Sequence, residues 1–407
     1  GPTKNISEIV CSNTSNPTII NHLDDTVNVI YTSGTTGKPK GTLIRNRSIE
    51  RLVINSKYVP LNSDTVILLS GTIAFDATTF EIFGALLNGG TLVITQQSTL
   101  LDPNELEKAI INHGVNTMWL TSSLFNQVVS EKIEALESLK YLLIGGEALS
   151  TKWVNLLNSR EKHPQIINGY GPTESTTFTT TFVIRDLYES HIPIGQPINQ
   201  TQVYVMQGEQ QCGFGVPGEL YIAGDGLAKG YLNQPEQTQN KFIDNPFGEG
   251  KLYKSGDLVR LRPDGNLDYI GRKDKQVKIR GFRIELTEIE KLLEKIDGIN
   301  KAVVVVKTRY KDKQIVAYYE GVNVMSHSIL HQHLAEELPQ YMIPNFFKKI
   351  EKIPTTINGK INEAALPEID VDIAANYKAP KNENEAYLCD LFEEVLHVEK
   401  VGVSDNF

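Results

Sequence analysis

The chain has 407 residues, of which 40% are hydrophobic and 22% charged, a balance typical of globular proteins. A single core rarely serves so long a chain, so we expect two or more domains. The net charge of −9 argues against a nucleic-acid partner, and no apolar run reaches the roughly 20 residues that cross a bilayer. The three cysteines have no metal-ligand spacing, and the N-terminus has no signal-peptide pattern. We therefore expect a cytoplasmic protein that binds neither nucleic acid nor membrane.

Between residues 27 and about 170, short β-branched runs alternate with longer amphipathic runs such as Asp102–His113 and Ser122–Ile133. This alternation predicts βαβ units and an α/β fold with a largely parallel sheet. Ligands bind beyond the carboxyl ends of the strands in such sheets, so the loops after the strands are the expected place for chemistry. The predicted strands are Val27–Thr32, Thr65–Ser70, Thr91–Thr95, Asn116–Leu120, Tyr141–Ile144 and Gln165–Ile167.

The pattern changes twice after this region. Short strands with Gly and Pro turns, at Val203–Met206, Glu219–Ala223 and Asn266–Tyr269, predict a β-rich subdomain. A charged junction at Arg272–Lys275 is followed by a compact α+β pattern, then by a polar linker and an amphipathic helix. The elements predicted there are strands Val277–Ile279, Ala302–Lys307 and Gln314–Tyr319 and helices Leu286–Lys295, Ile329–Glu337 and Asn384–Leu396. The predicted divisions are a large core at 1–271, a small C-terminal domain at 272–366, a linker at 367–382 and the start of another domain at 383–407.

A loop rich in Gly, Ser, Thr and Lys, Tyr31–Gly41, directly follows the first predicted strand. Glycines let the backbone turn tightly, so that N–H groups and hydroxyls can converge on phosphate oxygens while lysines add positive charge. It is not a Walker loop, because only two residues separate Gly34 from Gly37 and because Pro39 prevents entry into a helix. The loop therefore predicts phosphate binding, with a solvated turn as the plainer alternative.

Together with this loop, six later segments resemble, in order, the core motifs of the adenylate-forming superfamily. The six segments are Asn168–Glu174, Gly218–Ile222, Tyr253–Leu258, Gly271–Asp274, Lys278–Glu285 and Pro354–Lys360. The resemblance covers nearly the whole chain and is strongest to the adenylation domains of nonribosomal peptide synthetases. It implies a large core, with a parallel sheet, helices and a β-rich subdomain, joined to a smaller mobile α+β C-terminal domain.

The resemblance also implies a binding site for ATP. Tyr170 would stack on adenine, Asp257 would accept hydrogen bonds from the ribose hydroxyls, and Arg272 would reach ribose or phosphate. Taken by itself, Asp257 could equally be a turn former. The other nucleotide-binding residues that the resemblance implies are Thr32, Ser33, Gly34, Thr35, Thr36, Gly37, Lys38, Gly146, Asn168 and Gly171.

Three residues carry the catalytic roles that the resemblance implies. Thr173 and Glu174 would hold the phosphates and Mg²⁺, with Glu174 as the metal ligand. Lys360 would bridge the substrate carboxylate and the α-phosphate and stabilise the charge that develops there. Singly, Glu174 could be a helix N-terminal charge and Lys360 a hairpin-turn lysine.

Asp274 resembles the hinge of this family, about which the small domain swings between two states. In one state Lys360 faces the active site for adenylation. In the other, a different face closes for thioester transfer, and the strand of Lys278 approaches the phosphopantetheine arm of a carrier domain.

Asp76 lies in a segment, Phe75–Phe80, that separates amino-acid from simple carboxylic-acid substrates in this family. The resemblance implies that its carboxylate pairs with the α-ammonium group of an amino acid, because a buried carboxylate needs a cation. The alternative is that Asp76 caps the helix Ala77–Leu87. The implied pocket also contains Ala77, Phe80, Trp119, Leu143, Gly145, Gly169, Thr177 and Phe178. This set resembles the family's valine pocket, in which the glycines leave room near the substrate's α and β carbons, and isoleucine would be the secondary substrate.

The expected function is ATP-dependent activation of an amino acid and its transfer to a carrier domain, with neighbouring synthetase domains as partners. The phosphate loop begins much earlier than in complete members of the family, so we expect that an N-terminal part, or an activator protein, completes the unit. The C-terminal segment resembles the first helix of a peptidyl carrier domain. The alternatives are an acyl-CoA or aryl-CoA ligase of the same superfamily and a non-catalytic truncated fragment.

Overall fold

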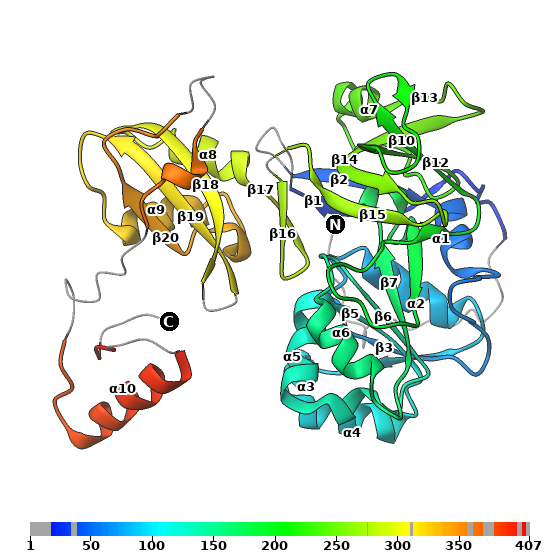
Figure 1. The fold of residues 1–407 in the computed structure, drawn as a ribbon, viewed down its shortest axis with the longest axis horizontal. Helices are drawn as coiled ribbons and strands as arrows, with labels where there is room; N and C mark the ends of the chain where they lie inside the picture. Colours follow the sequence, from blue (N-terminus) through cyan, green and yellow to red (C-terminus); the bar gives the residue numbers. More distant parts are fainter. Residues whose placement is uncertain are drawn as a thin grey trace.

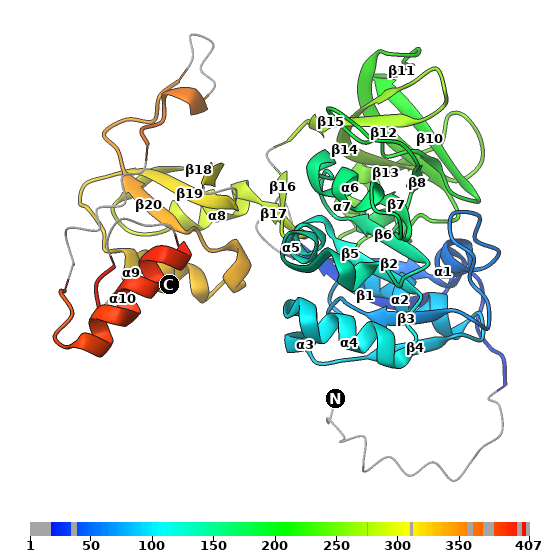
Figure 2. The ribbon, with the colours of Figure 1, turned by 60° about the horizontal axis from the view of Figure 1, so that its bottom comes forward.

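The computed structural model describes residues 18–33, 39–274, 276–309, 312–355, 361–368, 378–396 and 401–403. Figure 1 shows a larger body that carries the elements up to β15 and a smaller body that carries α8, α9 and β18–β20. A hairpin of β16 (Gln276–Ile279) and β17 (Phe282–Glu285) lies between the two bodies. Figure 2 shows the same separation from a second direction.

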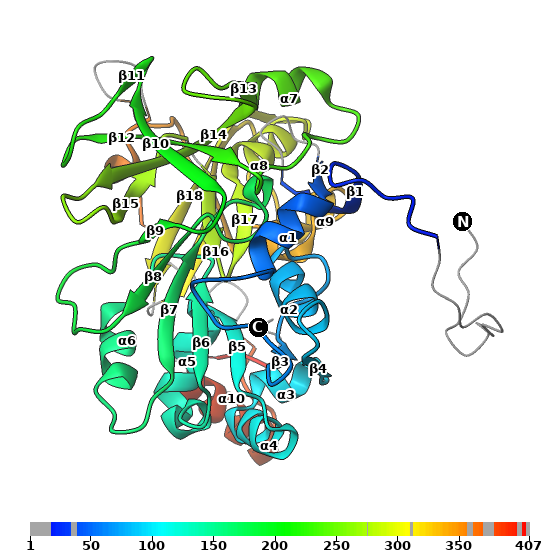
Figure 3. The same cartoon turned by 90° about the vertical axis from the view of Figure 1, so that its right-hand side faces the viewer.

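The larger body is built on a seven-stranded sheet with the order β4-β3-β5-β6-β7-β8-β9. Strands β3 to β7 are paired in parallel, while β8 and β9 are antiparallel additions at one edge. The strands, side by side in Figure 3, are β3 (Val66–Leu69), β4 (Thr91–Ile94), β5 (Thr117–Thr121), β6 (Tyr141–Gly145), β7 (Gln165–Tyr170), β8 (Thr180–Ile184) and β9 (Gln196–Pro197). The parallel sheet and its five strands predicted between residues 65 and 167 are therefore confirmed.

Helices cover both faces of this sheet because the strand side chains alternate between two cores. Leu142 and Ile144 belong to a core with α4, α5 and α6, whereas Leu143 belongs to a core with α1 and α2. The helices are α1 (Asn46–Val53), α2 (Ala77–Leu86), α3 (Gln97–Leu101), α4 (Pro103–His113), α5 (Ser122–Lys132) and α6 (Thr151–Asn158), with a short 3₁₀ turn η2 (Ile133–Leu136). The two helices predicted at α4 and α5 are confirmed.

The prediction was wrong for the first strand, which does not join the parallel sheet. Strand β1 (Thr26–Thr32) pairs antiparallel with β2 (Lys40–Arg45) in a separate two-stranded sheet. Local sequence favours a strand at both places, but it does not specify the partner strand, which tertiary packing decides.

The β-rich part of the larger body is a six-stranded antiparallel sheet. Its strands are β10 (Thr201–Gln207), β11 (Gln210–Gln211), β12 (Pro217–Gly224), β13 (Phe242–Asp244), β14 (Lys251–Leu261) and β15 (Leu267–Arg272), and α7 (Pro235–Lys241) precedes β13. The three predicted strands are confirmed. The long strand β14 was not predicted, because Ser255-Gly256-Asp257 in its middle has a turn-like composition.

The smaller body is a three-stranded sheet with helices on one face. Its elements are α8 (Leu286–Leu293), β18 (Ile299–Arg309), β19 (Asp312–Gly321), α9 (His327–Ala335) and β20 (Phe346–Lys349), with 3₁₀ turns η4 (Gln340–Met342) and η5 (Glu363–Ala365). Ala302 and Val304 pack with α8, α9 and the β16–β17 hairpin, while Val303 and Val305 pack on the other face with Ile353 and Ile361. The predicted helices and strands of this unit are confirmed.

The last described helix is α10 (Glu383–Leu396), close to the predicted Asn384–Leu396. Within the described part of the chain, no helix combines the length and the apolar character that a membrane crossing needs.

Candidate active site

The candidate site lies at the carboxyl ends of the parallel strands. Because β5, β6 and β7 are in register, Thr121 pairs with Gly145 and Gly145 with Gly169 at this edge. The chain segments that follow carry predicted nucleotide residues. Together with residues of β14, β15 and β16 they line a cavity of about 560 Å³. Its lining includes Gly146, Asn168, Tyr170, Gly171, Asp257 and Arg272, so the fold brings these six predicted residues together.

Asp76 stands directly before α2, yet its carboxylate does not cap that helix. Instead it accepts a hydrogen bond of 2.6 Å from the Thr173 hydroxyl, and its backbone carbonyl accepts one of 2.7 Å from the Thr177 hydroxyl. Burial raises the pKa of the Asp76 carboxyl, and the bond from Thr173 only partly opposes this. No basic side chain of the described residues forms an ion pair with it. The capping alternative is therefore wrong, and the carboxylate has no cation of its own among them.

The predicted pocket walls come together beside Asp76. Ala77, Phe80, Trp119, Leu143 and Phe178 all belong to one buried cluster. The rings of Phe80 and Phe178 pack at a centroid distance of 5.4 Å. The indole N–H of Trp119 is buried and has no hydrogen-bond partner in the described structure. The walls are thus apolar, with one buried donor.

The expected role of the two pocket glycines is corrected by the structure. A Cβ atom at Gly169 would lie 2.5 Å from the ring of Phe178, and one at Gly145 would lie 2.2 Å from the carbonyl oxygen of Gly169. The absent side chains therefore make room for neighbouring protein atoms, not for open space next to a ligand. Both glycines act through packing, because Gly169 lets Phe178 close against β7 and Gly145 leaves room for the Gly169 carbonyl.

Glu174 is fully buried in a 3₁₀ turn, η3 (Thr173–Ser175), among cationic and hydroxyl partners. Arg283 of β17 donates to its Oε2 at 2.8 Å, and the Tyr231 hydroxyl donates to its Oε1 at 2.7 Å. Lys40 lies 3.3 Å from the same Oε1 and is itself almost fully buried. Burial alone would raise the pKa of Glu174, but the charges of Arg283 and Lys40 hold it well below its usual range. Glu174 is therefore an ionised carboxylate at the centre of a charge cluster, not an exposed helix-end charge.

Asp257 lies inside strand β14, so the turn-former alternative is wrong. The Tyr170 hydroxyl donates to its Oδ2 at 2.5 Å, and Arg272 donates to its Oδ1 at 2.7 Å. The same guanidinium donates two hydrogen bonds, of 2.6 and 2.8 Å, to Asp274, the predicted hinge residue. Arg272 thereby connects the predicted ribose ligand with the predicted hinge.

The β16–β17 hairpin is docked on the larger body at this site. The Ser33 hydroxyl donates to the backbone carbonyl of Arg283 at 2.7 Å, and the Gly281 N–H donates to Glu147 at 3.2 Å. Lys313 of β19 also donates to Glu147. Gly281 has a φ of +81°, and a Cβ there would lie 2.8 Å from the Thr121 side chain, so this approach requires glycine.

Aromatic rings support the docked hairpin. Phe282 packs edge-on against Phe75 of the larger body, with ring centroids 4.8 Å apart, and stacks on Tyr341 of the smaller body at 3.9 Å. Lys278 of β16 lines the 560 Å³ cavity. Burial lowers its pKa, while Asp257 and Asp76 oppose that shift, so the lysine lies in the field of both carboxylates.

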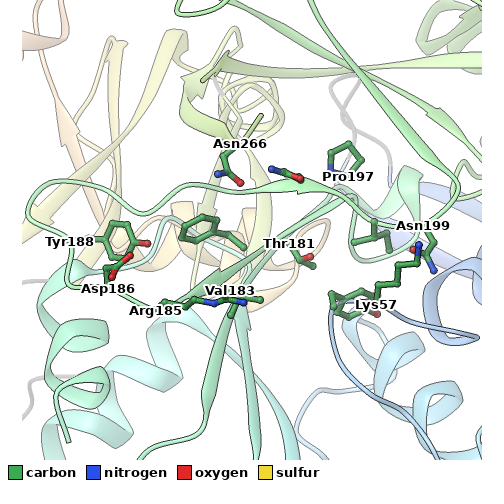
Figure 4. Close-up of a pocket in the computed structure, with 13 residues that line it drawn as sticks. Lys57, Thr181, Val183, Arg185, Asp186, Tyr188, Pro197, Asn199 and Asn266 are labelled. Carbon is green, nitrogen blue, oxygen red and sulfur yellow. The ribbon is translucent and has the colours of Figure 1, made fainter. Parts of the chain in front are cut away.

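A second cavity, of about 530 Å³, lies elsewhere on the larger body, near β8 and β9. Figure 4 shows Lys57, Arg185, Asp186 and Asn199 around it. None of the predicted site residues lines this cavity, so it plays no part in the site described above.

Several predicted residues lie outside the described part of the chain. They are Gly34, Thr35, Thr36, Gly37, Lys38 and Lys360, together with most of the loop before Lys360. The predicted Thr32 is described, and its hydroxyl is buried without a partner among the described residues.

Sequence reasoning did not single out four residues of the site, Lys40, Glu147, Tyr231 and Arg283. Lys40 and Arg283 lie inside motifs that were recognised, and their charge was the available signal. Glu147 and Tyr231 had no such signal, because their contacts with the hairpin and with Glu174 join residues more than 50 positions apart.

Known proteins are similar to this chain in sequence and in fold. A model of a family described as AMP-binding enzyme matches residues 3–232. Tyrocidine synthase 3 of Brevibacillus parabrevis is 43% identical over 397 residues, covering 96% of this chain and 6% of that protein. Gramicidin S synthase 2 of Aneurinibacillus migulanus is 45% identical over 401 residues, covering 97% of this chain and 9% of that protein. The chain thus spans under a tenth of the length of these two relatives.

Solved structures also have folds similar to that of this chain. Holo-PA1221, an NRPS protein containing adenylation and PCP domains, matches with a TM-score of 0.84 at 32% identity, covering 98% of this chain and 68% of that one. o-Succinylbenzoate CoA synthetase from Bacillus subtilis matches with a TM-score of 0.74 at 22% identity, covering 84% of this chain and 69% of that one, a likeness of fold alone. The same fold therefore occurs in a CoA ligase and in peptide synthetases, and side chains must separate the two activities.

Proposed function

This chain belongs to the AMP-binding enzyme family, as a ligase of the adenylation type found in nonribosomal peptide synthetases, and we propose that it activates an amino acid for peptide synthesis. In the proposed reaction the amino-acid carboxylate attacks the α-phosphate of ATP, and pyrophosphate leaves. The phosphopantetheine thiol of a carrier domain then attacks the aminoacyl carbonyl of the resulting adenylate, so that the thioester forms and AMP leaves.

The observation that carries this proposal is the state of Asp76. Its carboxylate is partly buried, has a raised pKa because of that burial, and pairs with no basic side chain of the described residues. An α-ammonium group would supply the missing cation, whereas a simple carboxylic acid would not. This favours an amino-acid substrate over the substrates of an acyl-CoA or aryl-CoA ligase.

The nucleotide would bind in the 560 Å³ cavity. Asp257 and Tyr170 both line this cavity, where Asp257 would accept hydrogen bonds from the ribose hydroxyls and Tyr170 would offer an aromatic face for adenine. The buried Thr32 hydroxyl, without a partner in the described structure, would donate to a phosphate oxygen. We propose that Lys360, which lies outside the described residues, stabilises the charge that develops at the α-phosphate.

The residues present fit Mg²⁺. This ion prefers oxygen ligands and is held through one or two carboxylates plus substrate phosphates. Glu174 is ionised and Thr173 adds a hydroxyl, and within the described ranges no cluster of three acidic, His or Cys side chains suggests an all-protein metal site. When bound, Mg²⁺ would neutralise charge on the phosphates.

We propose that the docked hairpin corresponds to the thioester-forming arrangement. The β16–β17 face of the smaller body meets the larger body, whereas Ile353 and Ile361, which flank the Lys360 loop, pack on the opposite face of the three-stranded sheet. A rotation about Asp274 would turn the face that carries the Lys360 loop toward the larger body, in place of the β16–β17 face. Arg272 holds the Asp274 carboxylate in the present arrangement.

We propose L-valine as the substrate, with isoleucine second. The support is an apolar wall of Phe80, Trp119 and Leu143 that offers no charge to a substrate side chain. Such walls separate neighbours that differ by one methylene by only about 1–3 kcal/mol.

We further propose the division into a core at 1–271, a small domain at 272–366, a linker at 367–382 and a carrier-domain start at 383–407. On α10, Tyr387 and Leu388 are 67% and 49% exposed, which suits a helix that packs within a further unit. A carrier domain and adjacent synthetase domains are the proposed partners.

The test is amino-acid-dependent exchange of labelled pyrophosphate into ATP, run over the proteinogenic amino acids. We expect the strongest exchange with valine and its loss in Lys360→Ala. Asp76→Asn should lower kcat/KM for the amino acid by about 10²–10³-fold, because it leaves the substrate ammonium without its partner.

Asp244→Asn is the matched control. Its carboxylate is 93% exposed and pairs with Lys251 at the surface, so activity should change less than about twofold. Exchange that prefers another amino acid would overturn the valine assignment alone. Activity with carboxylic acids that lack an amino group, unaffected by Asp76→Asn, would favour the CoA-ligase alternative.

A further inference from the structure

Arg283 places a guanidinium on the carboxylate that the proposed function assigns to Mg²⁺. Its Nη1 donates to Glu174 Oε2 at 2.8 Å, inside a region where the Glu174 side chain is fully buried and that of Arg283 is only 12% exposed. A charge-assisted hydrogen bond in such surroundings is among the stronger polar contacts of a protein. The larger body therefore binds the hairpin directly through a catalytic carboxylate.

The two oxygens of Glu174 have different kinds of partner. Oε1 is held by Tyr231 and Lys40, which both belong to the larger body. Oε2 is held by Arg283, which belongs to the β16–β17 hairpin. If the hairpin leaves, Oε1 keeps its partners and Oε2 becomes a buried, ionised oxygen that needs a cation.

The hairpin backbone also contacts a residue that was predicted to bind the nucleotide. The Ser33 hydroxyl, in the predicted phosphate loop, donates to the Arg283 carbonyl at 2.7 Å. The strand that carries Arg283 thus occupies a donor assigned to phosphate and a carboxylate assigned to the metal at the same time.

We infer that Arg283 is a positioning residue of the thioester-forming step, which replaces Mg²⁺ at Glu174 when the hairpin docks. This inference rests on the proposed function. Docking then requires that the metal has left Glu174, and a metal that returns to Glu174 expels the hairpin. Because the guanidinium keeps Glu174 paired, the carboxylate has a cation in both arrangements. The order of the two half-reactions follows from this competition.

The experiment measures hairpin docking by hydrogen exchange of residues 276–285, detected by mass spectrometry on the full chain with AMP bound. The reporter is the Gly281 N–H, which donates to Glu147 in the docked arrangement. Mg²⁺ alone is titrated without pyrophosphate, and ionic strength is held constant with NaCl so that screening does not change. We expect Mg²⁺ to lower the protection of this segment in the unmodified protein.

Arg283→Ala should reduce the protection by about tenfold or more, since a hydrogen bond between charged groups is lost, and should make it insensitive to Mg²⁺. Lys313→Ala is the matched control, because it removes a different contact of the docked state, the ion pair with Glu147. It should weaken protection but keep the response to Mg²⁺. Arg283→Lys should retain part of the protection and part of its response to Mg²⁺.

Two outcomes overturn the inference. One is a response to Mg²⁺ in Arg283→Ala that equals the response in Lys313→Ala. The other is a flat response in the unmodified protein. Pyrophosphate exchange on the same preparations separates the two proposals. A flat response with amino-acid-dependent exchange intact rejects the role of Arg283 alone, while absent exchange with an intact response rejects the proposed function.

Discussion

The carboxylates around α2 and those around the nucleotide cavity have opposite surroundings. Asp76 and Glu81 form no ion pair among the described residues, and burial raises the pKa of both, to about 7 for Glu81. Glu174 and Asp274 have cationic partners, which outweigh burial and hold the pKa of each below its usual range. Among the described residues, cations therefore pair directly with the carboxylates on the nucleotide side, whereas on the amino-acid side Lys278 and Arg283 act on Asp76 only through their charge, without an ion pair.

This difference indicates the charge of the ligand that each side can bind. A carboxylate without a cation is costly unless it is protonated or a ligand supplies the charge. Glu81 is satisfied as an acceptor for the Ser70 hydroxyl and two backbone N–H groups at the end of β3. Asp76 has only the hydroxyl of Thr173, so it remains the place where a cationic ligand gains most.

The strongest test of this contrast compares one carboxylate from each side. Glu174→Gln should lower the free energy of unfolding by about 3–5 kcal/mol, because Arg283 and Lys40 lose their counter-charge while buried. Asp76→Asn should leave it unchanged or raise it, because burial no longer penalises a charge. Urea denaturation at pH 7 measures both. Equal losses in the two variants would contradict the contrast.

The next effect concerns pH and Glu81. Its pKa in the folded protein, about 7, exceeds the ordinary value of 4.5, so the folded state retains a proton that the unfolded state releases between these values. The stabilisation is fully present below pH 4.5 and is lost as pH rises through about 7, a change of about 3 kcal/mol. Glu81→Gln should remove this contribution. The free energies of unfolding measured at pH 5 and pH 8 should then differ less in this variant than in the unmodified protein. An equal difference in both proteins would contradict the proposed contribution of Glu81.

The smallest effect probes the nucleotide side. Arg272→Ala leaves Asp257 and Asp274 without their shared cation and should weaken AMP binding by about 10–100-fold, as expected for hydrogen bonds between charged groups. Arg160→Ala is the matched control, since its pairs with Glu134 and Glu137 are at the surface. Calorimetric titration with AMP measures both. Similar affinities in the two variants would show that Arg272 does not contribute to AMP binding.

Much of the site was predictable because its residues follow strands or lie in recognisable motifs. Gly146, Asn168 and Gly171 lie near one another as expected, since parallel strands bring their carboxyl ends to one edge. Asp257 and Arg272, from the antiparallel sheet, line the same cavity. The direct partners of these groups were less predictable. Glu147 and Tyr231 have no local pattern, and the expected open space at Gly169 is filled by Phe178.

The sequence by itself determined the alternation of strands and helices and the loops in which we expect the chemistry. These features depend on periodicity, turn residues and helix caps such as Asp102, which act over a few residues. Only the tertiary structure decided that β1 pairs with β2 outside the parallel sheet and that Arg283 reaches Glu174 across 109 positions of the chain. Such contacts depend on which faces of distant segments pack together, a property that no local pattern encodes.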